Sequence, residues 1–230
     1  MTILRFALKR AFRSPVNVLL LCVIPVGVAL LPAVEGRDWT LPIGYHLYGM
    51  VIMSAAFLMV RSILEDRISG ALQRISAAPV SHMRYLAETL LAYGALLLIQ
   101  TVLVVGIGVL AHGGRIHSPL LLFVAYFFFS LTSIAFALAW CSLFGRRDVA
   151  YGTLSSVITL LTMLGGFYWP IEIMPVFLQR TAPLNPCYWL MEAARELQKS
   201  GLTWRFALSL AVMLLFTVAF LLVGSRRRME

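Results

Sequence analysis

Long uncharged stretches alternate with short charged ones along the whole chain. An apolar helix needs about 20 residues to cross the hydrocarbon core of a membrane. Six stretches approach or exceed that length, at about residues 16–33, 44–64, 86–111, 118–143, 149–168 and 205–223. A composition of 60% hydrophobic and 13% charged residues excludes an ordinary soluble domain. The pattern predicts an all-α membrane protein with six transmembrane helices, in which residues 1–230 form a single transmembrane domain.

The segment before the first apolar stretch has a helical pattern of its own. Apolar residues such as Ile3 and Leu8 oppose Arg5, Lys9 and Arg13, as in a helix that lies in the membrane interface. We therefore predict an interfacial helix over residues 1–14. A cleaved signal peptide is the alternative, but removing the first span would leave an odd number of crossings, so we expect it to be retained.

The loop at residues 61–85, RSILEDRISGALQRISAAPVSHMRY, is long enough to hold a helix. Its apolar residues recur at helical spacing, at Leu64, Ile68, Leu72 and Ile75. Glu65 and Asp66 suit a first turn, and Pro79 ends the pattern. The spacing predicts an amphipathic helix over residues 65–80, which either docks on another protein or rests on lipid headgroups. Gly70 favours the docking partner, because glycine weakens a helix and permits close approach.

The charge distribution indicates an orientation. The net charge is +9, and with both termini in the cytoplasm 13 of the 19 Lys and Arg residues lie inside. This is the bias expected for a membrane protein, so it requires no nucleic acid. Residues 65–84 and 144–149 then lie in the cytoplasm and residues 169–204 outside it.

Residues 169–204 contain four prolines, Pro170, Pro175, Pro183 and Pro186, which make a continuous spanning helix implausible. Two short helices are expected instead. The first covers roughly residues 171–180, and the second begins at Pro186 after the N-cap Asn185 and stops at Gly201. Trp169, Tyr188 and Trp189 suit the boundary between membrane and water. The segment is expected to be an outer re-entrant hairpin, and the alternative is a folded loop that shields the bundle.

Signatures of a membrane enzyme are absent from the sequence. There is no HExxH zinc pair, GxSxG elbow or GxxxxGK[ST] phosphate loop. Cys22, Cys141 and Cys187 have neither a metal-binding spacing nor a disulfide framework. At helical spacing, Glu192, Arg195 and Glu196 are typical of a surface ion-pair group. We expect no catalytic residue, metal site or cofactor on this chain.

An ion-coupled secondary transporter would usually need ionisable groups within its spans. Glu88 is the only acidic candidate, and an i, i+4 pair with Arg84 at the interface explains it. Few charges in the spans, together with an aromatic-rich fourth span (residues 123–129), favour an amphipathic or lipophilic cargo over a small ion. A membrane-embedded enzyme and an ion-coupled secondary transporter remain the alternative functions.

Two motifs give the chain a family resemblance. The loop DRISGALQRISAAPVS, from Asp66 to Ser81, resembles the coupling segment of the type-2 ABC exporter permeases. Residues 165–195, GGFYWPIEIMPVFLQRTAPLNPCYWLMEAAR, are similar to their outer re-entrant segment. The resemblance covers the whole chain, although the family often has acidic residues where Ile68 and Gln73 stand.

The resemblance implies a multi-pass permease of the bacterial inner membrane with both termini in the cytoplasm. It implies a second permease subunit, identical or related, and two cytoplasmic ATPase subunits that hold ATP and Mg²⁺. The residues that would couple to the ATPase are Asp66, Arg67, Gly70, Leu72, Arg74, Ile75 and Pro79. The residues of the outer re-entrant gate would be Gly165, Gly166, Pro170, Pro175, Asn185 and Pro186.

Overall fold

The computed structural model describes residues 19–31, 42–68, 82–113, 118–144, 147–199 and 202–226. Within these ranges every regular element is a helix. The long elements are α4 (Ile43–Ile68), α6 (His82–His112), α7 (Pro119–Leu143), α8 (Arg147–Leu164) and α11 (Trp204–Arg226). The shorter ones are η1 (Leu19–Val23), α3 (Ile24–Ala29), η3 (Ile171–Ile173), α9 (Val176–Thr181), η4 (Ala182–Leu184) and α10 (Pro186–Lys199).

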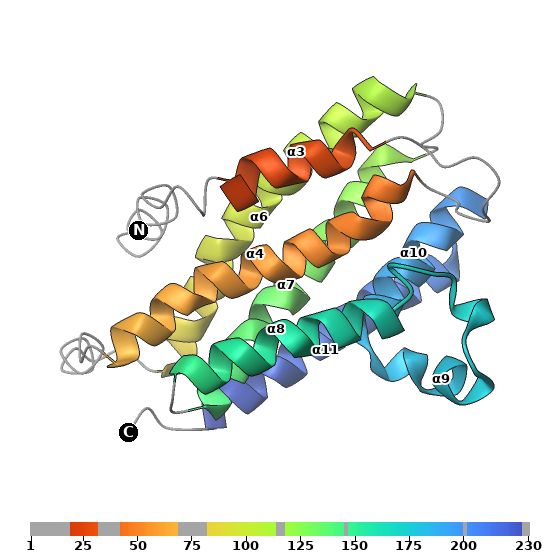
Figure 1. Cartoon of the computed structure of the whole chain (residues 1–230). Coiled ribbons are helices and arrows are strands. Elements are labelled where there is room, and N and C mark those ends of the chain that lie inside the picture. Colours follow the sequence, from red (N-terminus) through yellow and green to blue (C-terminus); the bar gives the residue numbers. More distant parts are fainter. Residues whose placement is uncertain are drawn as a thin grey trace.

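The long helices run side by side along one direction and form a bundle (Figure 1). α9 and α10 lie at one end, which we call the hairpin end. At the opposite end α4 terminates, α6 begins and α11 terminates (Figure 1). The chain therefore passes repeatedly from one end of the bundle to the other.

α7 lies at the centre of the bundle and packs against α4, α6, α10 and α11. Tyr126 and Phe129 of α7 are almost completely buried. Polar side chains also join the helices. The Tyr126 hydroxyl donates to the carbonyl of Tyr45 at 2.7 Å, and the Thr132 hydroxyl donates to the carbonyl of Met213 at 3.0 Å. Such bonds satisfy polar groups that have no access to water, as expected within a membrane.

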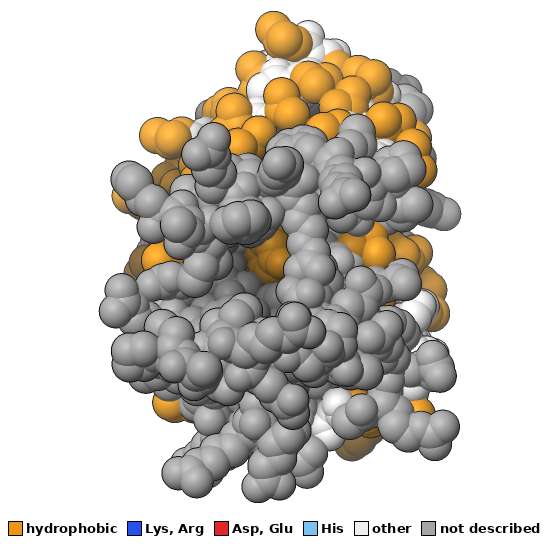
Figure 2. Space-filling model, turned by 90° about the vertical axis from the view of Figure 1, so that its left-hand side faces the viewer, with side chains coloured by type: hydrophobic (Ala, Val, Ile, Leu, Met, Phe, Trp, Pro, Cys, Tyr) orange, Lys and Arg blue, Asp and Glu red, His pale blue; other side chains and the backbone are white. Residues whose placement is uncertain are grey.

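Four of the described helices are long and apolar enough to cross a membrane. The apolar parts are Ile43–Val60, Tyr93–His112, Pro119–Leu143 and Trp204–Gly224. Large apolar side chains on α11, including Leu215 and Leu222, are exposed, as a surface in contact with lipid requires. In the view onto the end opposite the hairpin, the described side chains at the flanks of the bundle are mostly hydrophobic (Figure 2). The chain is an all-α multi-pass membrane protein.

The other two expected spans correspond to shorter apolar helices. The apolar part of α8 is Gly152–Leu164. In the first expected span, the described residues form η1 and α3, joined just before Pro25. Six crossings therefore remain a prediction.

Two expected boundaries can be compared with the structure. α4 continues to Ile68, so Glu65 and Asp66 lie in its last turn, whereas we expected the first turn of a separate helix. No Gly or Pro in residues 61–68 interrupts the helix there. The helix expected at 171–180 is divided into η3 and α9, because Pro175 cannot continue a helix begun before it. The expected interfacial helix at 1–14, and residues 69–80 of the expected helix at 65–80, lie outside the described residues.

Candidate functional site at the junction of α8 and α10

The first turn of α10 lies deep inside the bundle. The thiol of Cys187 is 3.5 Å from the sulfur of Met53 in α4. Met53 is ten residues beyond Ile43, the start of α4, which at 1.5 Å per residue is about 15 Å from the hairpin end. A hydrocarbon core is about 30 Å thick, so α10 begins near its middle if α4 spans that core. From there α10 runs back towards the hairpin end, where Met191 contacts His46 near the start of α4.

α8 ends at the same depth, in a compact glycine turn. The N–H of Phe167 donates to the carbonyl of Thr162 at 3.2 Å, and the N–H of Gly166 donates to that of Met163 at 3.4 Å. Gly166 has φ +89°, a conformation that side-chain-bearing residues rarely adopt. This pair of bonds is the Schellman arrangement that ends many helices. The turn buries Phe167 between α4 and α7, where its ring meets the ring of Phe129 edge to face.

Gly165 is the point at which α8 and α10 touch. A Cβ at this position would overlap the Cβ of Cys187 and would lie 2.9 Å from the carbonyl oxygen of Leu161. The carbonyl oxygen is a main-chain atom and the Cβ is bonded directly to the main chain, so neither atom can move away by rotation of a side chain. The absence of a side chain at Gly165 is therefore what allows α10 to start so close to α8.

Asn185 joins the two helices by hydrogen bonds. Its side-chain N–H donates to the carbonyl of Leu161 in the last turn of α8 at 2.6 Å. Its side-chain oxygen accepts the N–H of Cys187 at 3.0 Å, which is an N-cap for α10 as the sequence predicts. Asn185 and Pro186 are both buried. One side chain thus caps α10 and fixes it to α8.

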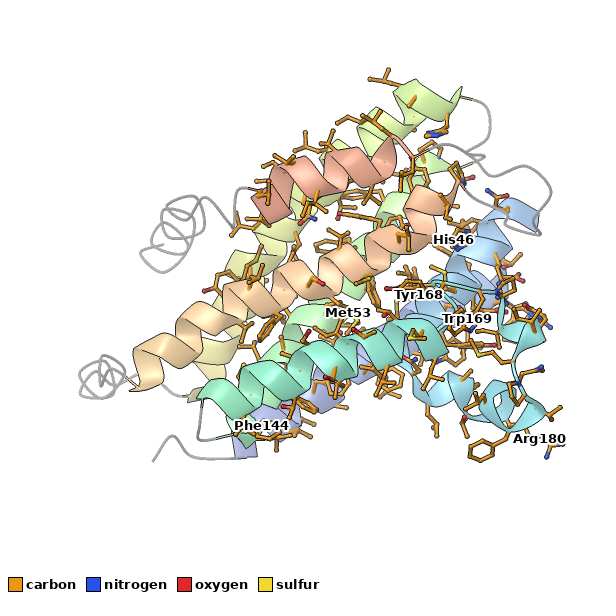
Figure 3. The ribbon with its side chains drawn as sticks, in the orientation of Figure 1. His46, Met53, Phe144, Tyr168, Trp169 and Arg180 are labelled. Carbon is orange, nitrogen blue, oxygen red and sulfur yellow. The ribbon has the colours of Figure 1, made fainter. Side chains whose placement is uncertain are left out.

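Between this turn and α10, the chain forms a separate small lobe at the hairpin end. Ile171, Met174 and Ala182 form its own apolar cluster. Pro170 and Pro175 precede η3 and α9 respectively, each in an extended conformation that starts the next turn. Arg195 of α10 holds the lobe through a two-point ion pair with Glu172, at 2.8 and 3.4 Å. Figure 3 shows Trp169 near α10 and Arg180 at the far tip of the lobe.

One face of α8 is exposed and carries small or polar residues. Gly152, Ser155, Ser156 and Thr159 recur at helical spacing and are all exposed. The opposite face, with Leu154 and Ile158, is buried against the bundle. The hydroxyl of Thr159 donates to the carbonyl of Ser155 at 3.0 Å, and Ser156 bonds its own helix likewise. Small and hydroxylated residues in membrane helices are typical of helix contacts or of polar pathways rather than of lipid-facing surfaces.

The structure places the residues that we assigned to the outer re-entrant gate at this junction and in the lobe, and their role as a gate stays a prediction. Gly165 contacts Cys187, the residue after Pro186, and Asn185 bonds Leu161 in the last turn of α8. Gly166 contacts Ile171 of the lobe, in which Pro170 and Pro175 precede η3 and α9. Of the predicted coupling residues, Asp66 and Arg67 belong to the end of α4. The others, Gly70, Leu72, Arg74, Ile75 and Pro79, lie outside the described residues.

Sequence reasoning missed three features of this junction. It assigned no partner to Glu172 and placed Arg195 in a group with Glu192 and Glu196. The structure contains the expected pair of Arg195 with Glu192, at 3.9 Å, but gives Arg195 a closer ion pair with Glu172, at 2.8 Å. Glu196 instead accepts a hydrogen bond from Thr203 at 3.0 Å. Phe167 and the sulfur contacts of Cys187 were also missed, because their partners lie on α4 and α7, far away in the sequence.

Comparisons with known proteins indicate the family of the chain. Residues 24–226 match the sequence profile of the family described as ABC-2 family transporter protein. The chain is also similar to the linearmycin resistance permease protein LnrN of Bacillus subtilis (strain 168), with 28% identity over 162 residues. The match covers 67% of this chain but only 40% of that relative. The chain thus matches less than half of the length of this curated relative.

Proposed function

Because the chain belongs to the ABC-2 transporter family, as its match over residues 24–226 establishes, we propose that it is the membrane-spanning permease subunit of an ATP-driven exporter. In this proposal, residues 1–230 form one transmembrane domain with six crossings in the bacterial plasma membrane. Both termini lie in the cytoplasm and the hairpin end faces outwards. The family match carries the proposal, and the positive-inside distribution of Lys and Arg supports the orientation.

The energy source is a separate pair of ATPase subunits, which hold ATP and Mg²⁺. The sequence contains no phosphate-binding loop, so the nucleotide must be bound by a partner. The segment that begins at Asp66 and Arg67 transmits closure of the ATPases to the spans. The continuity of α4 through Ile68 supports this role, because a rigid helix carries a displacement at its end directly into the bundle.

The substrate pathway runs along the polar face of α8, between this subunit and a second permease subunit. The exposed Ser155, Ser156 and Thr159 support this placement, since lipid would favour an apolar surface there. The junction of Gly165 and Asn185 closes the pathway at its outer part. Movement of α10 at this junction would open it, because α10 begins near mid-depth and is fixed to α8 at few points.

The cargo is amphipathic or lipophilic. The described parts of the spans are mainly apolar, and their polar groups are chiefly hydroxyls that can accept a partly polar molecule. The relative's name refers to resistance to linearmycin, and a permease that confers resistance is consistent with movement out of the cell.

Transport in inside-out membrane vesicles tests this proposal. Vesicles from cells that express the chain with its cognate ATPase should accumulate an amphipathic fluorescent dye when ATP is added. The matched control carries an ATPase whose phosphate-loop lysine is replaced, and it should accumulate none. Uptake that follows a proton or sodium gradient without ATP would instead establish the ion-coupled alternative.

A further inference from the structure

The small lobe at residues 171–184 exposes large apolar side chains. Ile173, Val176, Phe177 and Leu184 are 62–78% exposed, and we call these four residues the apolar face of the lobe. No residue of α9 is buried, and Figure 1 shows α9 beside the main bundle rather than within it. Large apolar side chains that are exposed together mark contact with a membrane or with another protein. The apolar face therefore needs a covering partner, either lipid or protein.

Both ends of the lobe join the bundle within the depth of the hydrocarbon core. At the first end Ile171 lies against Gly166, where an added Cβ would be 3.0 Å from the Ile171 side chain. At the other end Leu184 precedes Asn185, which caps α10 next to the contact with Met53, about 15 Å from the hairpin end of α4. That distance is about half the thickness of the core. The exposed side chain of Leu184 is thus at a depth where acyl chains surround a membrane protein.

Polar side chains of the lobe bond to its own main chain. The side-chain N–H groups of Gln179 donate to the carbonyls of Glu172 and Met174 at 3.1 and 2.8 Å. The hydroxyl of Thr181 donates to carbonyls of its own helix, α9, at 3.2 Å. The four prolines between residues 170 and 186 carry no N–H group, which removes four donors from the segment. Such internal satisfaction of polar groups suits a surrounding that offers little water.

The residue types favour lipid over a second protein as the covering partner. Helices that pack on each other in membranes use small and hydroxylated residues, which this chain exposes on α8, whereas the apolar face has only large side chains. Arg180 is exposed at the tip of the lobe (Figure 3), and no carboxylate among the described residues forms an ion pair with it. An arginine beside an apolar helix face reaches out to the interface, where lipid phosphates carry the complementary charge. Trp169 and Tyr188, which pack on the core of the lobe, are residues that favour the same interface.

We propose that the lobe is a lipid-docking element of the leaflet at the hairpin end, which is the outer leaflet in the proposed orientation. Its apolar face inserts among the acyl chains, and Arg180 binds the phosphate of a phospholipid. The ion pair of Glu172 with Arg195 and the contact of Ile171 with Gly166 connect the docked lobe to the junction of α8 and α10. Lipid contact thereby supports that junction from outside the bundle. This inference depends on the chain crossing the membrane, and it holds whatever the cargo or the energy source.

A nitroxide label on a single cysteine at Phe177 measures the depth of the lobe, in the full chain without native cysteines in lipid nanodiscs. Labels on the exposed residues Trp204, Leu208 and Leu215 provide a ruler, because they stand at the start of α11 and about 6 and 16 Å along it. The ruler also shows whether the cysteine-free chain is folded. We expect the label at Phe177 to collide with oxygen more often than with a water-soluble nickel chelate, in a ratio between those at Trp204 and Leu215. Dominant collision with the chelate would place the lobe in water, and rare collision with either reagent would place it under protein. Either result would overturn the proposal.

Photochemical cross-linking in intact membranes gives a second test that keeps the native cysteines. Benzoylphenylalanine replaces Phe177, and in a matched control it replaces Leu215, which is 67% exposed on the lipid-facing side of α11. After illumination, mass spectrometry should detect phospholipid adducts at both positions. An adduct of Phe177 with a second protein chain instead of lipid, or lipid adducts at Leu215 alone, would contradict docking of the lobe in lipid.

Charge variants test the contact of Arg180 with phosphate. One basic residue near an anionic bilayer surface raises the affinity about fivefold. In membranes of mixed phosphatidylglycerol and phosphatidylcholine, Arg180→Gln should therefore lower the share of phosphatidylglycerol among the adducts at Phe177 by up to about fivefold. Arg180→Lys keeps the charge and should restore the share. An unchanged share in Arg180→Gln would show that Arg180 does not bind the phosphate of an anionic lipid.

Discussion

Replacing Gly165 with alanine tests whether close contact between α8 and α10 holds the junction together. The new methyl group would overlap the Cβ of Cys187, so the two helices would have to separate by roughly 1 Å to restore van der Waals contact. Overpacking of this kind costs about 1–3 kcal/mol. The same separation would stretch the bond of 2.6 Å from Asn185 to Leu161, and losing that bond costs a further 0.5–1.5 kcal/mol or so. We expect a total destabilisation of about 2–4 kcal/mol.

Thermal unfolding of the detergent-solubilised chain, followed by circular dichroism, measures this effect. At roughly 2–4 °C per kcal/mol for a chain of this size, the midpoint should fall by at least about 4 °C. Gly106→Ala is the matched control, because a Cβ there meets nothing within 4 Å and alanine favours a helix by up to about 1 kcal/mol. Its midpoint should stay level or rise. If Gly165→Ala unfolds at the same temperature as the unmodified chain, α8 and α10 do not pack so closely at residue 165 that a side chain forces them apart.

Three further predictions concern the junction, the orientation and the coupling segment. Asn185→Ala should destabilise the chain by about 1–3 kcal/mol, and Asn185→Ser by less, since serine can still cap α10; equal unfolding midpoints for both variants and the unmodified chain would contradict this. Single cysteines at Gln73 and Gln179, in a chain without native cysteines, should react with an impermeant thiol reagent from opposite sides of the membrane. Labelling of both from outside intact cells would refute the proposed orientation. Asp66→Lys and Arg74→Glu should leave membrane insertion intact but abolish co-purification with the ATPase, because like-charge contacts at an interface can cost several kcal/mol. Normal assembly of both variants would favour a helix that rests on lipid.

Local chain chemistry made the start of α10 predictable from the sequence. Asn185 followed by Pro186 specifies an N-cap and a first helical residue without reference to the rest of the fold. The structure places the start of α10 there. The long apolar helices α4, α6, α7 and α11 were predictable for a similar reason, since their length and composition suffice.

The depth of α10 could not be predicted from the sequence. It follows from contacts with α4 across more than a hundred residues, such as Cys187 with Met53. Sequence spacing carries no information on such pairs, so the packing of Cys187 against α4 could not be predicted. The same limitation applies to Glu172 and Arg195, which are brought together by the fold of the lobe rather than by helical spacing.

The end of α4 illustrates a different limit. Carboxylates at residues 65 and 66 suit the start of a helix, but they do not terminate the preceding one. Without a Gly or Pro between residues 61 and 68, the helix continues through them. The placement of acidic residues was therefore a weaker boundary signal than the absence of a helix breaker.

ATP hydrolysis by the purified components tests the central claim most directly. The chain alone, reconstituted in lipid vesicles, should hydrolyse ATP only at background rate, because its sequence lacks a phosphate-binding loop. Addition of the cognate ATPase should give activity that exceeds the activity of the ATPase without the chain, and that disappears when the phosphate-loop lysine of the ATPase is replaced. Robust ATP hydrolysis by the chain alone would contradict the assignment of a permease driven by a separate ATPase.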